Sequence, residues 1–267
     1  MIRRAVPFLA VVAALCAGCS GASPDRARPP AQPAPPAADH GETVRTAVAA
    51  TRGGSAHFET RHELGSEGRH FTLTMTGDFD FASDRGHVAV DFPEGGISHI
   101  DEIFTDGLVH VSNLPQAEGK WATMPRTAAE AHYLLRAPLN DPEHVLEQLA
   151  SIHEATRVGT EDLDGTPTTH YRGTLLEDAI TLRITEKIRT GLPDIAALFP
   201  DGRLSIPADV WLNPEGRVVR TRLTLQQAGM DIVATTTLSR HGTPVPVDAP
   251  KAEQTVPVDT IKGVLPG

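Results

Sequence analysis

The chain has 267 residues and a formal net charge of −10, with 24 basic residues against 34 acidic ones. This excess of acid argues against nucleic-acid binding, which needs Lys and Arg to neutralise phosphates, and against a polybasic attachment to membranes. The two cysteines, Cys16 and Cys19, both lie near the N-terminus, so the rest of the chain must fold without disulfides.

The first 18 residues have the organisation of a bacterial signal peptide. Arg3 and Arg4 precede an apolar run over residues 5–17, which is too short to span a bilayer as a helix. The run ends in the sequence LCAGC, which is similar to a lipobox and predicts cleavage before Cys19 with a diacylglyceryl thioether on that residue. The alternative is an ordinary secretory signal with an incidental cysteine. In both cases the chain leaves the cytoplasm, and lipidation would anchor it to the outer face of the cell membrane.

Cleavage removes two basic residues, so 22 remain against 34 acidic ones and the net charge becomes −12. Residues 19–40 then form a Pro- and Ala-rich linker without apolar periodicity, about 60 Å long if extended. It is either a spacer between membrane and domain or a remnant without a role. We predict a single domain over residues 41–252 and a loosely docked tail over 253–267.

Apolar periodicity predicts a helix over residues 41–52, capped by Asp39, and then about ten short strands. The period of two begins at Ser55 and is clearest over residues 70–81. Hairpin turns are expected at Asp106-Gly107, the strongest such signal, and at residues 213–216. The other strands are expected at residues 88–92, 97–105, 108–111, 120–124, 156–163, 168–175, 206–212, 219–225 and 230–240.

Helical patterns interrupt the strands in the middle of the chain. Asp141 and Pro142 precede an apolar stripe that predicts a helix up to residue 152. Residues 177–189 fit either a helix or a strand, and we favour a crossover helix, followed by one more helical turn over 196–199. Together, these strands and helices predict an α+β fold in which a curved antiparallel half-barrel has helices on its concave side.

A half-barrel of this kind leaves apolar space between sheet and helices. The inward-facing strand residues are either plain core or the lining of a ligand cavity. The candidates for the cavity lining are Phe71, Leu73, Met75, Phe79, Phe81, Val88, Val90, Phe92, Val210, Leu212, Leu223 and Leu225.

Two stretches carry a resemblance to a known family. Residues 206–220 read IPADVWLNPEGRVVR and residues 168–174 read TTHYRGT, with Ala249-Pro250 as a third shared point. Together they resemble the LppX/LprG lipoprotein family of mycobacterial type. The resemblance implies a fold similar to LolA and LolB, a cavity for the acyl chains of glycolipids or other lipids, and a role in moving lipids across the envelope.

The sequence contains no strong indication of catalysis. Residues 96–100 lack the second glycine of a nucleophile elbow, and the mature chain keeps no cysteine beyond the lipidated one. His57, His62 and His70 could be imagined as a zinc set, but solvent-facing strand residues explain them better. Glu161, Asp162 and Asp164, like Glu177 and Asp178, suit turns and a helix N-terminus better than paired catalytic carboxylates.

We therefore predict a non-enzymatic, monomeric lipoprotein that binds a lipid or glycolipid and carries or presents it, with no cofactor and no metal. A membrane transporter is a candidate partner. The rival hypothesis is an anchored lipoprotein with a filled core that acts as a sensor or accessory of a membrane partner. A weaker rival is a hydrolase with a site built from distant residues.

Overall fold

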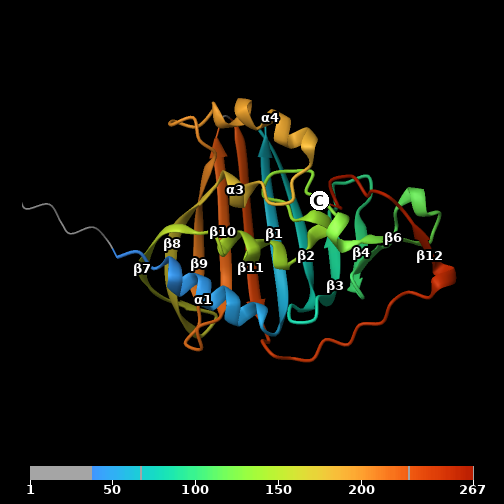
Figure 1. Cartoon of the computed structure of the whole chain (residues 1–267), viewed down its shortest axis with the longest axis horizontal. Coiled ribbons are helices and arrows are strands. Elements are labelled where there is room, and N and C mark those ends of the chain that lie inside the picture. The colour runs from blue at the N-terminus through green and yellow to red at the C-terminus, as the bar shows by residue number, and fades with distance from the viewer. Residues whose placement is uncertain (1–37, 67, 228, 267) are drawn as a thin grey trace, which may run out of the picture. The chain divides into compact units, whose positions relative to one another are not determined.

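A computed structural model of the protein describes residues 38–266 apart from positions 67 and 228 (Figure 1). The predicted signal peptide, Cys19 and almost all of the linker lie outside these residues. The helices are α1 (Gly41–Arg52), α2 (Glu143–Leu149), α3 (Glu177–Ile180) and α4 (Glu186–Ala196). Short 3-10 turns are η1 (Pro115–Ala117), η2 (Arg126–Ala128), η3 (Pro138–Asn140) and η4 (Ala252–Gln254).

Twelve strands form one sheet. They are β1 (Ser55–Ser66), β2 (Arg69–Asp80), β3 (Arg85–Asp91), β4 (His99–Thr105), β5 (Leu108–Val111), β6 (Trp121–Pro125), β7 (His153–Leu163), β8 (Thr166–Leu176), β9 (Ser205–Leu212), β10 (Val218–Gln227), β11 (Met230–Ser239) and β12 (Thr255–Pro257). Their order is β12-β6-β5-β4-β3-β2-β1-β11-β10-β9-β8-β7. Neighbouring strands are antiparallel except β12 and β6, which are parallel. In the part of the chain that the structure describes, β7 and β12 are the edges of a sheet that does not close.

The expected strands are present: β1 lies where the period of two begins at Ser55, and β12 has no counterpart among the predicted strands. Strand β2 shows why the alternation was readable: Leu73, Met75 and Phe79 are buried, while Thr76 and Asp78 are exposed. The Asp106-Gly107 turn between β4 and β5 has positive φ at both residues, as a two-residue hairpin of the primed type requires.

The helices α1, α2 and α3 lie in front of the sheet on one of its faces (Figure 1). Helix α1 begins where the sequence predicted, with the Gly41 amide donating to Asp39 Oδ1 over 2.9 Å. It buries Val44, Ala47 and Val48. The ambiguous residues 177–189 are helical in two pieces, α3 and the first turn of α4, so the favoured interpretation is confirmed for most of that segment.

The expectation of a loosely docked C-terminal segment was wrong. Strand β12 extends the sheet at β6, and the side chains of Ile261 and Leu265 are each 3% exposed. Its sequence has few apolar residues with regular spacing, so periodicity gave no signal. The segment is held by single apolar side chains, Ile261 and Leu265, which contact the core only because of the tertiary fold.

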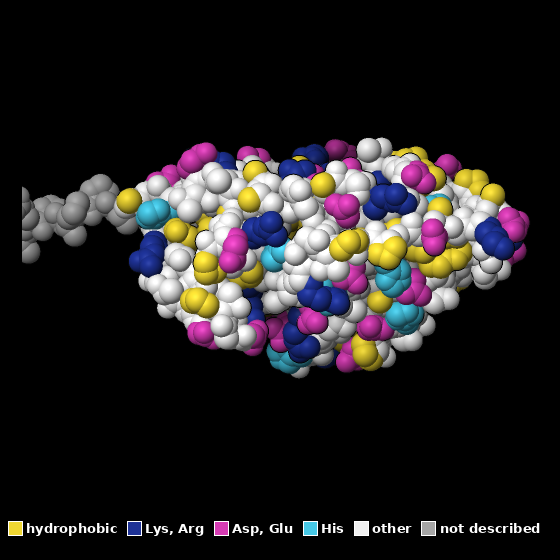
Figure 2. All heavy atoms as spheres, turned by 90° about the horizontal axis from the view of Figure 1, so that it is seen from below, with side chains coloured by type: hydrophobic (Ala, Val, Ile, Leu, Met, Phe, Trp, Pro, Cys, Tyr) yellow, Lys and Arg dark blue, Asp and Glu magenta, His cyan; other side chains and the backbone are white. Residues whose placement is uncertain are grey.

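Figure 2 views the molecule from below Figure 1 and shows acidic, basic and histidine side chains mixed over that face, with apolar side chains in small groups. Among the described residues, no helix is long and apolar enough to cross a membrane.

Candidate functional site

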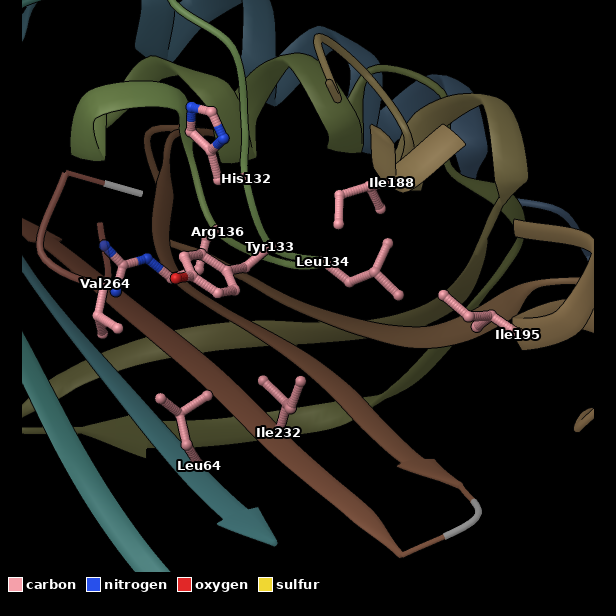
Figure 3. A pocket seen from close by; sticks show the side chains of 9 residues that line it. All are labelled: Leu64, His132, Tyr133, Leu134, Arg136, Ile188, Ile195, Ile232 and Val264. Atoms are coloured by element: carbon pink, nitrogen blue, oxygen red, sulfur yellow. The ribbon is translucent and has the colours of Figure 1, made fainter. Parts of the chain in front are cut away.

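An apolar pocket of about 300 Å³ lies between the end of the sheet and helix α4. Leu64 of β1 and Ile232 of β11, which are cross-strand neighbours, form one wall. Figure 3 shows their side chains on the opposite side of the pocket from Ile188, Ile195 and Leu134. The remaining lining residues are His132, Tyr133, Arg136 and Val264.

Helix α4 contributes to the pocket because it is amphipathic. Ile188 and Ile195 are seven residues apart and lie on one face, together with buried Leu192. The start of the helix is fixed to the segment before α2, since the Thr185 amide donates to the Ala131 carbonyl over 3.0 Å and the Ala131 amide to the Arg183 carbonyl over 2.8 Å. These bonds place the two segments side by side as adjoining walls.

A buried polar cluster adjoins the apolar walls. The Arg136 guanidinium donates through Nη2 to Asn140 Oδ1 and, over 3.1 Å, to the Leu265 carbonyl. Asn140 Nδ2 in turn donates to Glu102 Oε1 over 2.8 Å and to the same carbonyl over 2.6 Å. The backbone of Leu135, Leu139 and Asn140 has positive φ, so this segment is folded tightly to bring the two polar side chains together.

Burial shifts the pKa values of three side chains in and beside this cluster. It raises the pKa of Glu102 well above its usual value, against the opposing effects of Asn140 and Arg136. It lowers the pKa of Arg136 to about 10, so the guanidinium remains charged near neutral pH. It also lowers the pKa of His62 well below its usual value, and nearby Arg136 adds to that effect.

A wider groove of about 630 Å³ adjoins the pocket and shares His132, Tyr133 and Ile188 with it. Charged side chains of both signs line it, including Lys187 and Lys262 with Glu130 and Glu186. An amphipathic molecule could therefore enter the apolar pocket from a polar, water-accessible groove.

A second polar cluster lies on strands β7, β8 and β9. The two ring nitrogens of His170 each lie within hydrogen-bond distance of a carboxylate oxygen, 2.7 Å from Glu161 Oε1 and 2.6 Å from Asp209 Oδ1. Its ring stacks on Trp211 at 4.2 Å, and Trp211 Nε1 donates to Glu161 Oε2 over 3.0 Å. Every polar group named here has a partner, which fits a structural network that links three strands.

The histidines considered as a zinc set do not come together. His57 pairs with Asp78 at 3.0 Å, whereas His62 points to the other face of β1 and His70 is exposed on β2. The expectation of a solvent-facing residue was wrong for His62, which is 4% exposed. In the described residues, no three His, Asp or Glu side chains are arranged as metal ligands.

Most of the twelve candidates for the cavity lining lie in the core. Ten of them are buried, and Phe71 and Phe92 are half-buried, with ring centroids 6.2 Å apart. Met75 and Leu223 border a small void of about 30 Å³, and Phe92 borders a surface pocket near residues 262–266. The apolar pocket has none of the twelve in its lining, so their role in ligand binding stays a prediction.

Sequence reasoning missed the residues that do line the pocket. They come from five segments, and two of these, residues 132–136 and the C-terminal segment, carry no regular periodicity. The isoleucine spacing of α4 was the one available signal.

No protein-family model matches the sequence, and no curated protein matches it. Among solved structures, the chain is similar to the lipoprotein LppX of Mycobacterium tuberculosis at 18% identity, over 78% of this chain and 97% of that one, with a TM-score of 0.51. It is also similar to LprF of Mycobacterium bovis at 15% identity, over 79% of this chain and 96% of that one, with a TM-score of 0.49. A LolA superfamily protein of Nitrosomonas europaea matches at 10% identity, over 80% and 96% of the two chains, with a TM-score of 0.31. The likeness to LppX shows that this chain shares its fold, a large, mostly antiparallel sheet that does not close and carries few helices.

Proposed function

We propose that the protein is an envelope lipoprotein of the LppX/LprG type that binds the apolar chain of a lipid and carries or presents it. Residues 1–18 are removed, Cys19 carries the anchor, and the linker up to residue 40 holds the domain away from the membrane. The single observation that supports ligand binding is the pocket of about 300 Å³ with its aliphatic walls.

The chemistry of the pocket favours a hydrocarbon chain. Leu64, Leu134, Ile188, Ile195 and Ile232 supply apolar surface on opposite sides, and an occupant would remove that surface from water. Each buried methylene contributes about 0.8 kcal/mol, so a short acyl chain is enough for measurable affinity. A pocket with these walls selects for apolar surface more than for one head group.

Native mass spectrometry of the purified protein tests the proposal. We expect a co-purifying lipid that is retained in the wild type and lost in Ile188→Trp, which fills the pocket. Val158→Trp is the matched control, because Val158 is an apolar residue of β7 that is 51% exposed and does not line the pocket.

The rival is an accessory protein with a filled core, and the burial of ten of the twelve cavity candidates favours it. It predicts that wild type, Ile188→Trp and Val158→Trp all carry no lipid and bind none when it is offered. That result would refute the lipid-binding proposal.

A further inference from the structure

Arg136 is a buried cation in the wall of an apolar pocket. Its residue is 3% exposed, and it borders the pocket together with Leu134 and Val264. The two hydrogen bonds of Nη2 go to neutral oxygens, those of Asn140 and of the Leu265 backbone. Its Nε has no hydrogen-bond partner in the described part of the chain.

In the part of the chain that the structure describes, the positive charge of Arg136 has no carboxylate in direct contact. Among residues 38–266 without positions 67 and 228, no acidic oxygen lies within 4.0 Å of its guanidinium nitrogens. Glu102 is connected to Arg136 through Asn140, which makes a hydrogen bond to each of them. Burial holds Glu102 toward its neutral form by raising its pKa. A buried charge without an ion pair is costly, and an unsatisfied donor adds to that cost.

An occupant of the pocket could supply the missing anion. We propose that Arg136 binds the acidic head group, a carboxylate or a phosphate, of a single-chain amphiphile whose hydrocarbon tail lies against Leu64, Ile188 and Ile232. This inference rests on the proposed function and adds the chemical class of the ligand. Charge-assisted hydrogen bonds from a guanidinium to such an oxyanion are about twice as strong as neutral ones.

The other cations near the pocket are poorer candidates. Lys187 and Lys262 are exposed to water in the adjoining groove, where Glu130 and Glu186 also lie. Exposed ion pairs contribute little, because water and salt screen them. The low dielectric around Arg136 makes its attraction for an anion much stronger.

The test compares three probes with the same ten-carbon chain: decanoate, decyl phosphate and decanol. Isothermal titration calorimetry near neutral pH measures their affinities for the purified full chain. We expect the two anions to bind at least about tenfold more tightly than the alcohol, as hydrogen bonds to a charged group imply. Arg136→Met should abolish this preference, while Arg136→Lys retains part of it.

The paired variant Lys187→Met/Lys262→Met is the control, and it should keep the full preference for anions. Equal binding of decanol and the anions by the wild type overturns the role of Arg136 but leaves lipid binding intact. Failure of all three probes to bind overturns the proposed function itself. If Arg136→Met does not fold, the other two variants still decide. Loss of the preference for anions in Lys187→Met/Lys262→Met refutes the inference. A preference that survives in that variant but weakens in Arg136→Lys supports it.

Discussion

Arg126 and Asp141 form a two-point ion pair, with Nε donating to Oδ2 and Nη2 to Oδ1, each over 2.8 Å. The guanidinium also contacts Glu143 Oε2 at 2.7 Å and lies 5.5 Å from the ring centroid of Phe79. Since Arg126 follows β6 and Asp141 precedes α2, this pair connects the sheet to the helices on its face.

We predict that Arg126→Met destabilises the protein by about 3 kcal/mol, because the buried Asp141 carboxylate loses its main partner and Glu143 keeps only Arg52 of its two arginine partners. Urea denaturation measures the loss. Arg45→Met is the control: its pair with Glu42 is largely exposed and should contribute less than about 0.5 kcal/mol. Similar losses in the two variants would contradict the structural role of Arg126.

A second prediction concerns the stability of the protein at acid pH. Burial lowers the pKa of His144 from its usual 6.5 to about 4, against the opposing effect of Asp141. Between these values the unfolded chain binds a proton at this position and the folded chain does not, so the stability it contributes is lost as the pH falls. The stability advantage of wild type over His144→Gln should shrink by up to about 1.4 kcal/mol per pH unit from pH 6.5 toward 4.

The raised pKa of Glu102 changes the stability in the opposite direction as the pH falls, since the folded chain holds a proton that the unfolded chain releases. Glu102 is present in both wild type and His144→Gln, so its effect cancels when their stabilities are subtracted. His153→Gln, at an exposed position of β7, controls for the loss of a histidine. A difference between wild type and His144→Gln that stays constant with pH would show that His144 is not held neutral.

The lipid anchor gives a third prediction. Cys19→Ala should abolish incorporation of labelled palmitate and release the protein from the membrane fraction, because the thioether can form only on a thiol. Cys16→Ala should keep both properties, since a bulky leucine precedes Cys16 and makes it a poor lipidation site. Labelling that persists in Cys19→Ala would refute the assignment of the lipobox.

The C-terminal segment gives a fourth. Leu265→Ala should cost about 3 kcal/mol, as a large-to-small change in a packed core does. Val264→Ala should cost less than about 1 kcal/mol, because Val264 is 40% exposed and borders the pocket. Thermal or urea unfolding compares the two, and equal small losses would mean that the segment is not part of the stable core.

Most of the strands could be read from the sequence, because alternation and turn chemistry are local. The alternation over residues 70–81 and the Asp106-Gly107 turn depend on neighbours a few residues apart. Residues 177–189 were harder. Ile180, Ile184 and Ile188 fit the period of a helix, whereas Ile180, Leu182 and Ile184 fit that of a strand. Contacts made by the fold, such as the pairing of Ala131 with Ile184, decided that the helix there is broken.

The sequence by itself determined the secondary-structure class, the expected route out of the cytoplasm and the resemblance to a lipoprotein family. Tertiary structure alone decided where the pocket lies, since its walls come from segments far apart in the chain. It also decided that His62, Glu102 and Arg136 are buried together. The physical reason is that burial and charge pairing depend on distances in space, whereas periodicity reports only which side of its own strand or helix a residue occupies.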